Sequence, residues 1–244
     1  MKRIFAFGRK RKGQPPLASA SAPRPAGACD LRQKALDKLH RAAACDDLAQ
    51  VRQGLKKRGV DGRDKAETPL HLACANGLAD VVTYLIENKC ELNLVDNGNR
   101  WPLMKAVQCQ QEKCVAILLE HGADPDLADA DGNSAVHLPV ISPNTSAAGL
   151  LLEHNTGIDA QNKEGCAPLI LAVSEHQGEI VEFLLNKGAD VHVPLAQQTP
   201  LMTAASGGEL NLIKVLLHYG ADVSHKDTNG WTAEDYAVVH GYSR

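Results

Sequence analysis

Two kinds of apolar segment alternate along the chain from about residue 31 onward. The first is short and in most copies begins with Thr or Ser, which Pro and Leu usually follow, as in Thr68-Pro69-Leu70-His71. The second, as at 180–185, repeats apolar residues at the spacing of one helix face and ends near Gly188. Thr caps helices, and Pro is favoured at their first position. The pattern predicts pairs of helices, a short inner one followed by an outer one.

The helix pair recurs with a nearly constant period. The first residues of the inner-helix segments are Thr68, Trp101, Ser134, Ala167, Thr199 and Thr232. Successive starts lie 33 residues apart, except for 32 between Ala167 and Thr199. Asp, Asn and Gly fill the segments between pairs, as at 96–99 and 129–132, and favour tight hairpin turns. Such a period is typical of stacked repeats, in which each unit buries its apolar face against its neighbours.

These segments resemble the ankyrin repeat, whose pattern is D-x-x-G-x-T-P-L-H-x-A, then a V-V-x-L-L helix and G-A-D. The resemblance covers residues 31–244 and implies an all-α ankyrin-repeat α-solenoid with short β-hairpin turns between helix pairs. The repeats are expected near 35–65, 66–98, 99–131, 132–164, 165–196 and 197–229, with a partial unit at 230–244. More narrowly, residues 1–9, 38–43 and 232–237 resemble the POTE-like group of vertebrate ankyrin proteins.

Charge separates the first thirty residues from the rest. Residues 1–30 hold seven Lys and Arg against one acid, which leaves 28 acidic and 19 basic residues in the remainder. An acidic body repels phosphate backbones, so nucleic acid is not expected as the main ligand. Rich in Pro, Ser and Ala, the head is expected to be disordered. Its basic cluster, beside Ile4, Phe5 and Phe7, fits a solvated tail, a nuclear import signal or a contact with anionic lipid. That cluster consists of Lys2, Arg3, Arg9, Lys10, Arg11 and Lys12.

The seven cysteines form no CxxC pair, and neither a signal peptide nor a run of about 18 apolar residues is evident. They are therefore expected to be reduced thiols of a cytoplasmic protein, with the nucleus or the inner face of the plasma membrane as alternative locations.

Residues that could carry chemistry are few. His71 and His137 have no nucleophile or partner acid in their motifs, and the ankyrin resemblance implies that they tie neighbouring turns together. Cys109, Cys114 and His121 lack the four-ligand spacing of a zinc site, so an exposed Cys109 and a packed Cys114 are expected instead. We predict no catalysis, no metal and no cofactor.

The resemblance implies a module that holds a partner protein in the concave groove of the solenoid. The residues expected to bind it lie in the turns and at the starts and ends of the inner helices. They are Arg100, Trp101, Gln108, Asp131, Asn133, Lys163, Glu164, Glu175, Gln198, Asn229 and Trp231. Their mixed polarity favours a folded surface or an extended segment over an apolar helix. The alternative function is a membrane-peripheral scaffold whose basic head contacts anionic lipid.

Two places depart from the repeat pattern. Pro139 stands where four other inner helices carry Ala, and it removes a hydrogen bond to the carbonyl of Ala135, so residues 136–146 are expected to be frayed. Near the C-terminal end, no outer helix with a polar face follows 232–239. We expect helix 212–217 to expose apolar side chains there and the chain to self-associate at this end.

Overall fold

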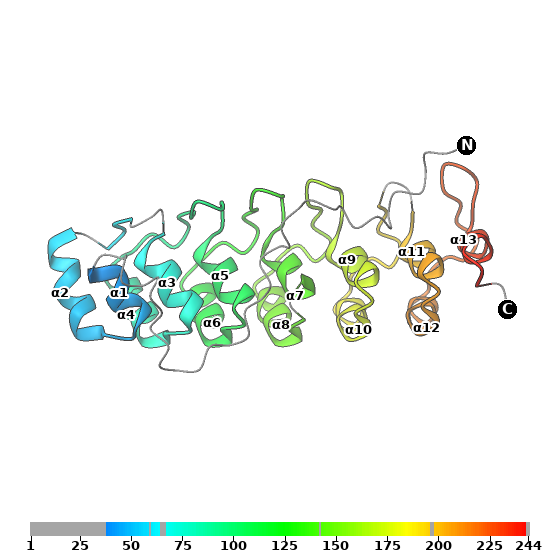
Figure 1. Cartoon of the computed structure of the whole chain (residues 1–244). Helices are drawn as coiled ribbons and strands as arrows, with labels where there is room; N and C mark the ends of the chain where they lie inside the picture. Colours follow the sequence, from blue (N-terminus) through cyan, green and yellow to red (C-terminus); the bar gives the residue numbers. More distant parts are fainter. Residues whose placement is uncertain (1–37, 59, 64–66, 142, 196–197, 243–244) are drawn as a thin grey trace.

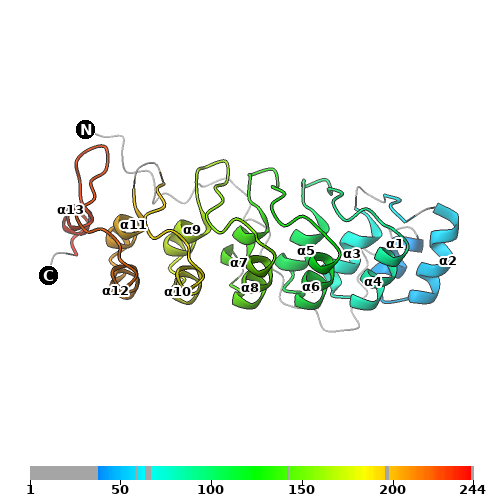
Figure 2. The ribbon, with the colours of Figure 1, turned by 180° about the vertical axis from the view of Figure 1, so that it is seen from behind.

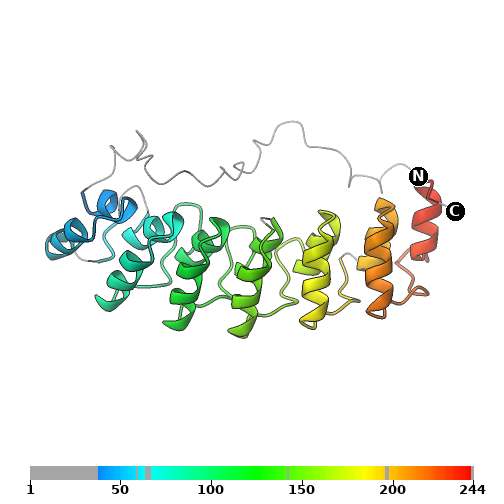
Figure 3. The same cartoon turned by 90° about the horizontal axis from the view of Figure 1, so that it is seen from below.

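The chain folds into a row of helix pairs, each standing beside the next from α1 at one end to α13 at the other (Figures 1 and 3). The computed structural model describes residues 38–58, 60–63, 67–141, 143–195 and 198–242. The helices are α1 (Lys38–Ala44), α2 (Leu48–Arg58), α3 (Pro69–Asn76), α4 (Ala79–Glu87), α5 (Pro102–Gln108), α6 (Glu112–Glu120), α7 (Leu138–Ile141), α8 (Thr145–Glu153), α9 (Pro168–Ser174), α10 (Gly178–Asn186), α11 (Pro200–Gly207), α12 (Leu210–His218) and α13 (Ala233–Val239). This arrangement confirms the predicted all-α solenoid. The predicted disorder and lipid contact of the head concern residues outside the described ranges.

Long loops project from the helix pairs on the side of the inner helices (Figures 1 and 2). We call them the finger loops. Tips of these loops lie at 96–100, 129–133, 162–166 and 227–231, and Leu195 and Gln198 close a further loop. The predicted hairpins are reduced to single closing contacts: Asp96 N–H donates to the Arg100 carbonyl at 2.9 Å, and Leu195 pairs with Gln198 as an isolated antiparallel bridge. The described part of the chain contains no extended strand.

Side-chain caps fix where several inner helices begin. The Thr68 side chain accepts the His71 N–H, and Thr199 does the same for the Met202 N–H. Pro follows each cap at the first helical position, where its missing N–H costs nothing. By contrast, Ala167 precedes α9 without any side-chain hydrogen bond.

Replacing Ala167 with Thr is expected to raise the free energy of unfolding by about 1 kcal/mol, because the hydroxyl would accept the Ile170 N–H as Thr68 and Thr199 do for their helices. Both threonines are buried at the equivalent position, so the site accommodates this side chain. Urea denaturation of Ala167→Thr and of the isosteric Ala167→Val checks the prediction. Equal stability of the two variants would show that the hydroxyl contributes nothing.

The apolar core is divided near its middle. One cluster of buried side chains extends from Leu39 to Leu151 and includes Leu138. The second extends from Val140 to Ala221. The boundary passes through the α7–α8 pair: Leu138 of α7 and Leu151 of α8 belong to the first cluster, whereas Val140 belongs to the second. A third, small cluster joins Met202, Ala205 and Tyr236 near the C-terminal end.

Pro139 lies in an inner helix that is shorter than the others. Residues Ala135–His137 form a 3-10 turn, and α7 contains only the four residues Leu138–Ile141. The Leu138 N–H donates to the Ala135 carbonyl, which thereby recovers the hydrogen bond that Pro139 cannot supply. Leu138, Pro139 and Val140 are nevertheless buried. The segment is distorted but packed, and its expected fraying stays a prediction.

The C-terminal end of the row exposes apolar side chains at positions that earlier repeats bury. Leu217 of α12 is 42% exposed, whereas Leu185, its equivalent in α10, is 5% exposed. Val223 and Val191 show the same contrast. The expected apolar exposure of the last outer helix is thus confirmed for Leu217, and it extends to Val223 in the loop that follows.

Cysteine placement agrees with the expectation for the central pair: Cys109 is exposed and Cys114 is buried, and both are free thiols. Within the described ranges, no helix is long and apolar enough to cross a membrane.

Candidate protein-binding face

We call the surface formed by the inner helices and the adjoining finger loops the inner face. Each repeat contributes an equivalent residue to this face. It lies four positions after the first residue of the inner-helix segment, for example Leu72 after Thr68. These residues are Leu72, Lys105, Leu138, Leu171, Thr203 and Tyr236. The residue three positions further on is Gln108 in α5 and Ile141 in α7.

Asx turns give the finger tips their shape. Oδ1 of Asp96 accepts the N–H groups of Gly98 and Arg100 at 2.7 and 2.9 Å. Asp129 and Asp227 bind the equivalent N–H groups of their own loops. These contacts confirm the predicted structural role of the turn aspartates. Asn162 has the same role with an amide oxygen.

Buried histidines tie successive repeats together. Nε2 of His71 lies 3.0 Å from the Arg100 carbonyl, and Nε2 of His137 lies 3.2 Å from the Cys166 carbonyl. Since a carbonyl only accepts, Nε2 carries the proton and Nδ1 accepts from the capping residue. This confirms the role that the resemblance implied. His40 makes the same contact with the Glu67 carbonyl at 3.0 Å.

These histidines should make stability depend on pH. Burial lowers the pKa of His71 and of His137, and their carbonyl contacts offset that effect only in part. Below pH 6.5 the unfolded chain therefore binds more protons than the native one, so the free energy of unfolding falls as the pH drops. Urea denaturation between pH 7.5 and pH 5 should show that the free energy of unfolding depends less steeply on pH in His71→Met than in the wild type. Met is chosen because Met104 occupies the equivalent position in the next repeat. Met202→His should steepen this dependence, and unchanged slopes in both variants would contradict this assignment.

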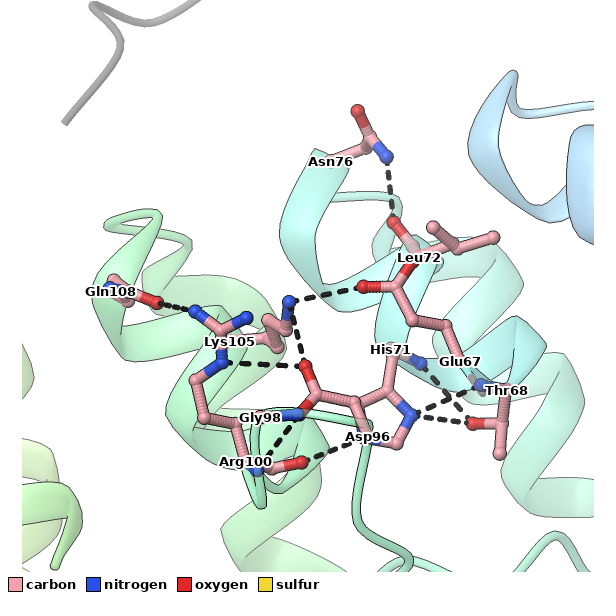
Figure 4. Close-up of polar contacts among 10 residues, drawn as sticks. All are labelled: Glu67, Thr68, His71, Leu72, Asn76, Asp96, Gly98, Arg100, Lys105 and Gln108. Atoms are coloured by element: carbon pink, nitrogen blue, oxygen red, sulfur yellow. Dashed lines mark hydrogen bonds and ion pairs between the residues drawn. The ribbon is translucent and has the colours of Figure 1, made fainter. Parts of the chain in front are cut away.

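A charged cluster crosses the inner face between α3 and α5 (Figure 4). Nζ of Lys105 lies 2.9 Å from Asp96 Oδ2 and 3.1 Å from Glu67 Oε1, so it links the finger loop of Asp96 to the residue before the cap of α3. Nε of Arg100 lies 3.3 Å from the same Asp96 oxygen. Nη1 of Arg100 lies 3.5 Å from Gln108 Oε1. The structure thus brings together two of the residues predicted to bind, Arg100 and Gln108.

Asp96 is held ionised within this cluster. Burial by itself would raise the pKa of its carboxyl group, but hydrogen bonds from the Arg100 N–H and Lys105 lower it further than burial raises it. The side chain is only 3% exposed, against 39% for Arg100. Asp96 is therefore an interior anchor, and Arg100 is the charged member that reaches solvent.

At the equivalent place near the other end of the row, Gln198 and Tyr236 stand where Glu67 and Lys105 stand, and Asp227 is the one charged member of their network. The Tyr236 hydroxyl donates to Asp227 Oδ2 at 2.8 Å, and Gln198 Nε2 donates to that hydroxyl at 2.6 Å. Gln198 and Tyr236 are 38 residues apart, as are Glu67 and Lys105. Trp231, which is half-buried, packs edge-on against Tyr236 with ring centroids 5.5 Å apart. Predicted residues Gln198 and Trp231 thus both contact Tyr236.

Trp101 is less available for binding than its position suggested. It directly precedes α5, its ring packs against the first core cluster, and its Nε1 donates to the Ala128 carbonyl at 3.3 Å.

Most of the remaining predicted residues take part in contacts between or within finger loops. Lys163 Nζ donates to the Ala130 carbonyl at 2.6 Å, and the Lys163 N–H donates to the Asp131 carbonyl. Asn133 accepts from Asn162 at 2.9 Å. Asn229 donates to Asp227 at 3.2 Å. Glu164 and Glu175 are exposed and lie apart from the charged cluster along the row.

Sequence reasoning left Asp96, Lys105 and Tyr236 out of the binding set. Lys105 gives a signal in the repeat register, because it stands where Leu72, Leu138 and Leu171 are found. Nothing in the sequence indicated that Lys105 would pair with Glu67 of the preceding repeat, because this contact depends on how the repeats stack.

No three His, Cys, Asp or Glu side chains converge as metal ligands within the described ranges, Cys109, Cys114 and His121 included.

Comparisons with known proteins agree with this architecture. The family model "Ankyrin repeats (3 copies)" matches residues 39–129, 122–194 and 194–244. A putative palmitoyltransferase ZDHHC13 of Danio rerio is 33% identical over 75% of this chain and 30% of its own length. The B-cell lymphoma 3 protein homolog of Mus musculus is 30% identical over 82% of this chain and 48% of its own length. The chain thus spans less than half of either relative.

Solved structures extend the likeness to three dimensions. The ankyrin repeat domain of Bcl-3 superposes with a TM-score of 0.79 at 29% identity, covering 82% of this chain and 93% of that one. The human ASB11 ankyrin repeat domain gives a TM-score of 0.71, also at 29% identity, over 82% of this chain and 91% of that one.

Proposed function

Because the chain belongs to the ankyrin-repeat family, whose arrays are protein-interaction modules, we propose that it binds a partner protein on its inner face and catalyses no reaction. One observation carries this proposal. The positions that build the stack keep their residue type, as Leu70, Leu103 and Leu169 show. The exposed inner-face position near the end of the inner helix changes from Gln108 to Ile141 and then to Ser174. A surface that varies over a constant core is suited to recognising one particular partner.

A pull-down from cell extract tests the proposal. Gln108→Ala and Glu175→Ala truncate exposed side chains on the inner face, so the fold should be unaffected. We expect both to lose proteins that the wild type retains. Lys113→Ala, on the exposed surface of outer helix α6, is the matched control and should retain them. Identical retained proteins for all four chains would contradict binding at the inner face.

The similarity to palmitoyltransferases supports a binding role and not acyl transfer. This chain spans only 30% of the Danio rerio protein. We propose that the shared part is the repeat array, which contributes partner recognition.

The membrane-peripheral alternative rests on the sequence of residues 2–12, outside the described ranges. Its basic residues would meet anionic lipid at about 1 kcal/mol each. Sedimentation with phosphatidylserine liposomes, with and without residues 1–12, separates this function from partner binding alone. Kinship with the POTE-like group and a cytoplasmic location are likewise proposals from sequence.

We also propose self-association through the apolar end of the row, because Leu217 and Val223 are exposed there. Sedimentation velocity should show an apparent mass that rises with concentration and a weaker rise for Leu217→Lys. Ile141→Lys, which charges an exposed apolar residue elsewhere, should behave as the wild type. A mass independent of concentration would contradict the proposal.

A further inference from the structure

We propose that the inner face between α3 and α7 recognises an extended segment of the partner that carries an acidic side chain and, close by, an apolar one. Arg100 and Gln108 would bind the carboxylate, and Ile141 would contact the apolar side chain. This inference rests on the proposed function and adds the chemistry of the bound segment.

Where Arg100 and Gln108 lie, the charged cluster offers more hydrogen-bond donors than acceptors. Asp96 Oδ1 accepts two backbone N–H groups, and Oδ2 faces both Lys105 and Arg100, so this carboxylate is fully used. Gln108 Oε1 faces Arg100 Nη1. The Arg100 Nη2 group and the Gln108 amide N–H groups have no acceptor among the described residues. A ligand rich in acceptors complements such a surface, and an ionised carboxylate forms the strongest of these hydrogen bonds.

Arg100 is prepared for such a ligand. The Asp96 carboxylate contacts both the backbone N–H and Nε of Arg100, so the Arg100 side chain loses little conformational freedom when a ligand binds. A guanidinium group presents parallel N–H groups that match the two oxygens of a carboxylate. Lys105, whose side chain is 12% exposed, forms ion pairs with Asp96 and Glu67 and thereby fixes the position of Asp96.

Ile141 provides an apolar contact one repeat further along the same face. It occupies in α7 the position that Gln108 occupies in α5, and it is 52% exposed. Leu171, on the next inner helix α9, is half-buried on the same face. Outside the apolar C-terminal end, Ile141 is the one large apolar side chain so exposed in the described part of the chain.

The distance between the two contacts favours an extended segment. Packed helices lie about 8–10 Å apart, and an extended chain advances about 3.3 Å per residue. The acidic and apolar side chains should therefore be separated by about three positions in the partner sequence.

Selection from random dodecapeptides displayed on phage tests this chemistry with the whole chain as bait. We expect enriched peptides to contain Asp or Glu about three positions from Leu, Ile, Val, Phe or Met. Selection on Arg100→Glu should favour Lys or Arg at the acidic position. Selection on Ile141→Asp should lose the apolar preference. Lys113→Glu and Leu210→Asp are controls that make corresponding charge changes at exposed positions of the outer helices α6 and α12, and they should select the wild-type motif.

Affinity measurements complete the test. A synthetic peptide of the enriched sequence should bind Gln108→Glu at least tenfold more weakly than the wild type, and an amide in place of its carboxylate should have a similar effect. Because Gln108 is exposed, this variant keeps the inference testable if Arg100→Glu fails to fold. Peptides that depend on inner-face residues but show no acidic preference would overturn the inference and leave the proposed function intact. Failure of every inner-face variant to affect any peptide would overturn both.

Discussion

Replacing Lys105 with Met should lower the free energy of unfolding by about 3 kcal/mol, one of the two largest effects expected of a single change in this chain. Lys105 joins the buried Asp96 to Glu67 of the preceding repeat. Met keeps most of the side-chain volume but removes the charge, which leaves Asp96 with Arg100 as its remaining side-chain partner. Removing one member of a buried ion pair is costly because the other stays desolvated.

Urea denaturation at neutral pH measures this loss. Lys113→Met makes the same change at an exposed position of α6 and should alter stability by less than about 0.5 kcal/mol. The pH profile gives an independent readout. Without Lys105, the pKa of Asp96 should rise toward its ordinary value of 3.8, so the stability that its ionised form provides is lost at a higher pH on acidification. Equal losses for Lys105→Met and Lys113→Met would show that the cluster does not stabilise the stack.

The second large effect is a gain. Pro139→Ala should raise the free energy of unfolding by about 2 kcal/mol, less than the roughly 3 kcal/mol cost of Pro in an unbroken helix, because the Leu138 N–H already satisfies the Ala135 carbonyl. The Ala variant can extend α7 to the length of the other inner helices.

Hydrogen exchange locates the effect. In the wild type, residues 136–146 should exchange faster than α9, and Pro139→Ala should reduce the difference. Pro168→Ala is the matched control: this proline stands at the first position of α9, where it costs nothing, so no gain is expected. Residues 136–146 as well protected in the wild type as residues 168–176 would contradict the prediction.

The fold could be predicted from the sequence because the same pattern of caps and apolar positions recurs in each repeat. Caps such as Thr68 and Thr232 mark helix starts, and the period sets the register. Local chemistry was equally accessible, since an Asx turn such as that of Asp96 closes within five residues. In both cases the contacts join residues that are close in sequence.

The inner face was only partly accessible. Arg100 and Gln108 could be placed on it by register, and the structure brings them together. The linking role of Lys105 could not be read, because its partner Glu67 is 38 residues away and the contact depends on stacking. Trp101 shows the converse: an aromatic residue at the start of a helix gives no indication whether its ring packs inward, as it does here.

The divided core also bears on how the protein folds as it is made. Every buried residue of the first cluster lies between Leu39 and Leu151, so this core needs no side chain from the second half. Domains generally fold as units, the N-terminal one first, during synthesis. Once Leu151 has left the ribosome, the first four helix pairs, α1 to α8, and the finger loops between them can assemble while the rest is still being translated. The repeats of the second half can then pack one after another against the folded first half, so each newly made apolar face is buried as the next repeat is added.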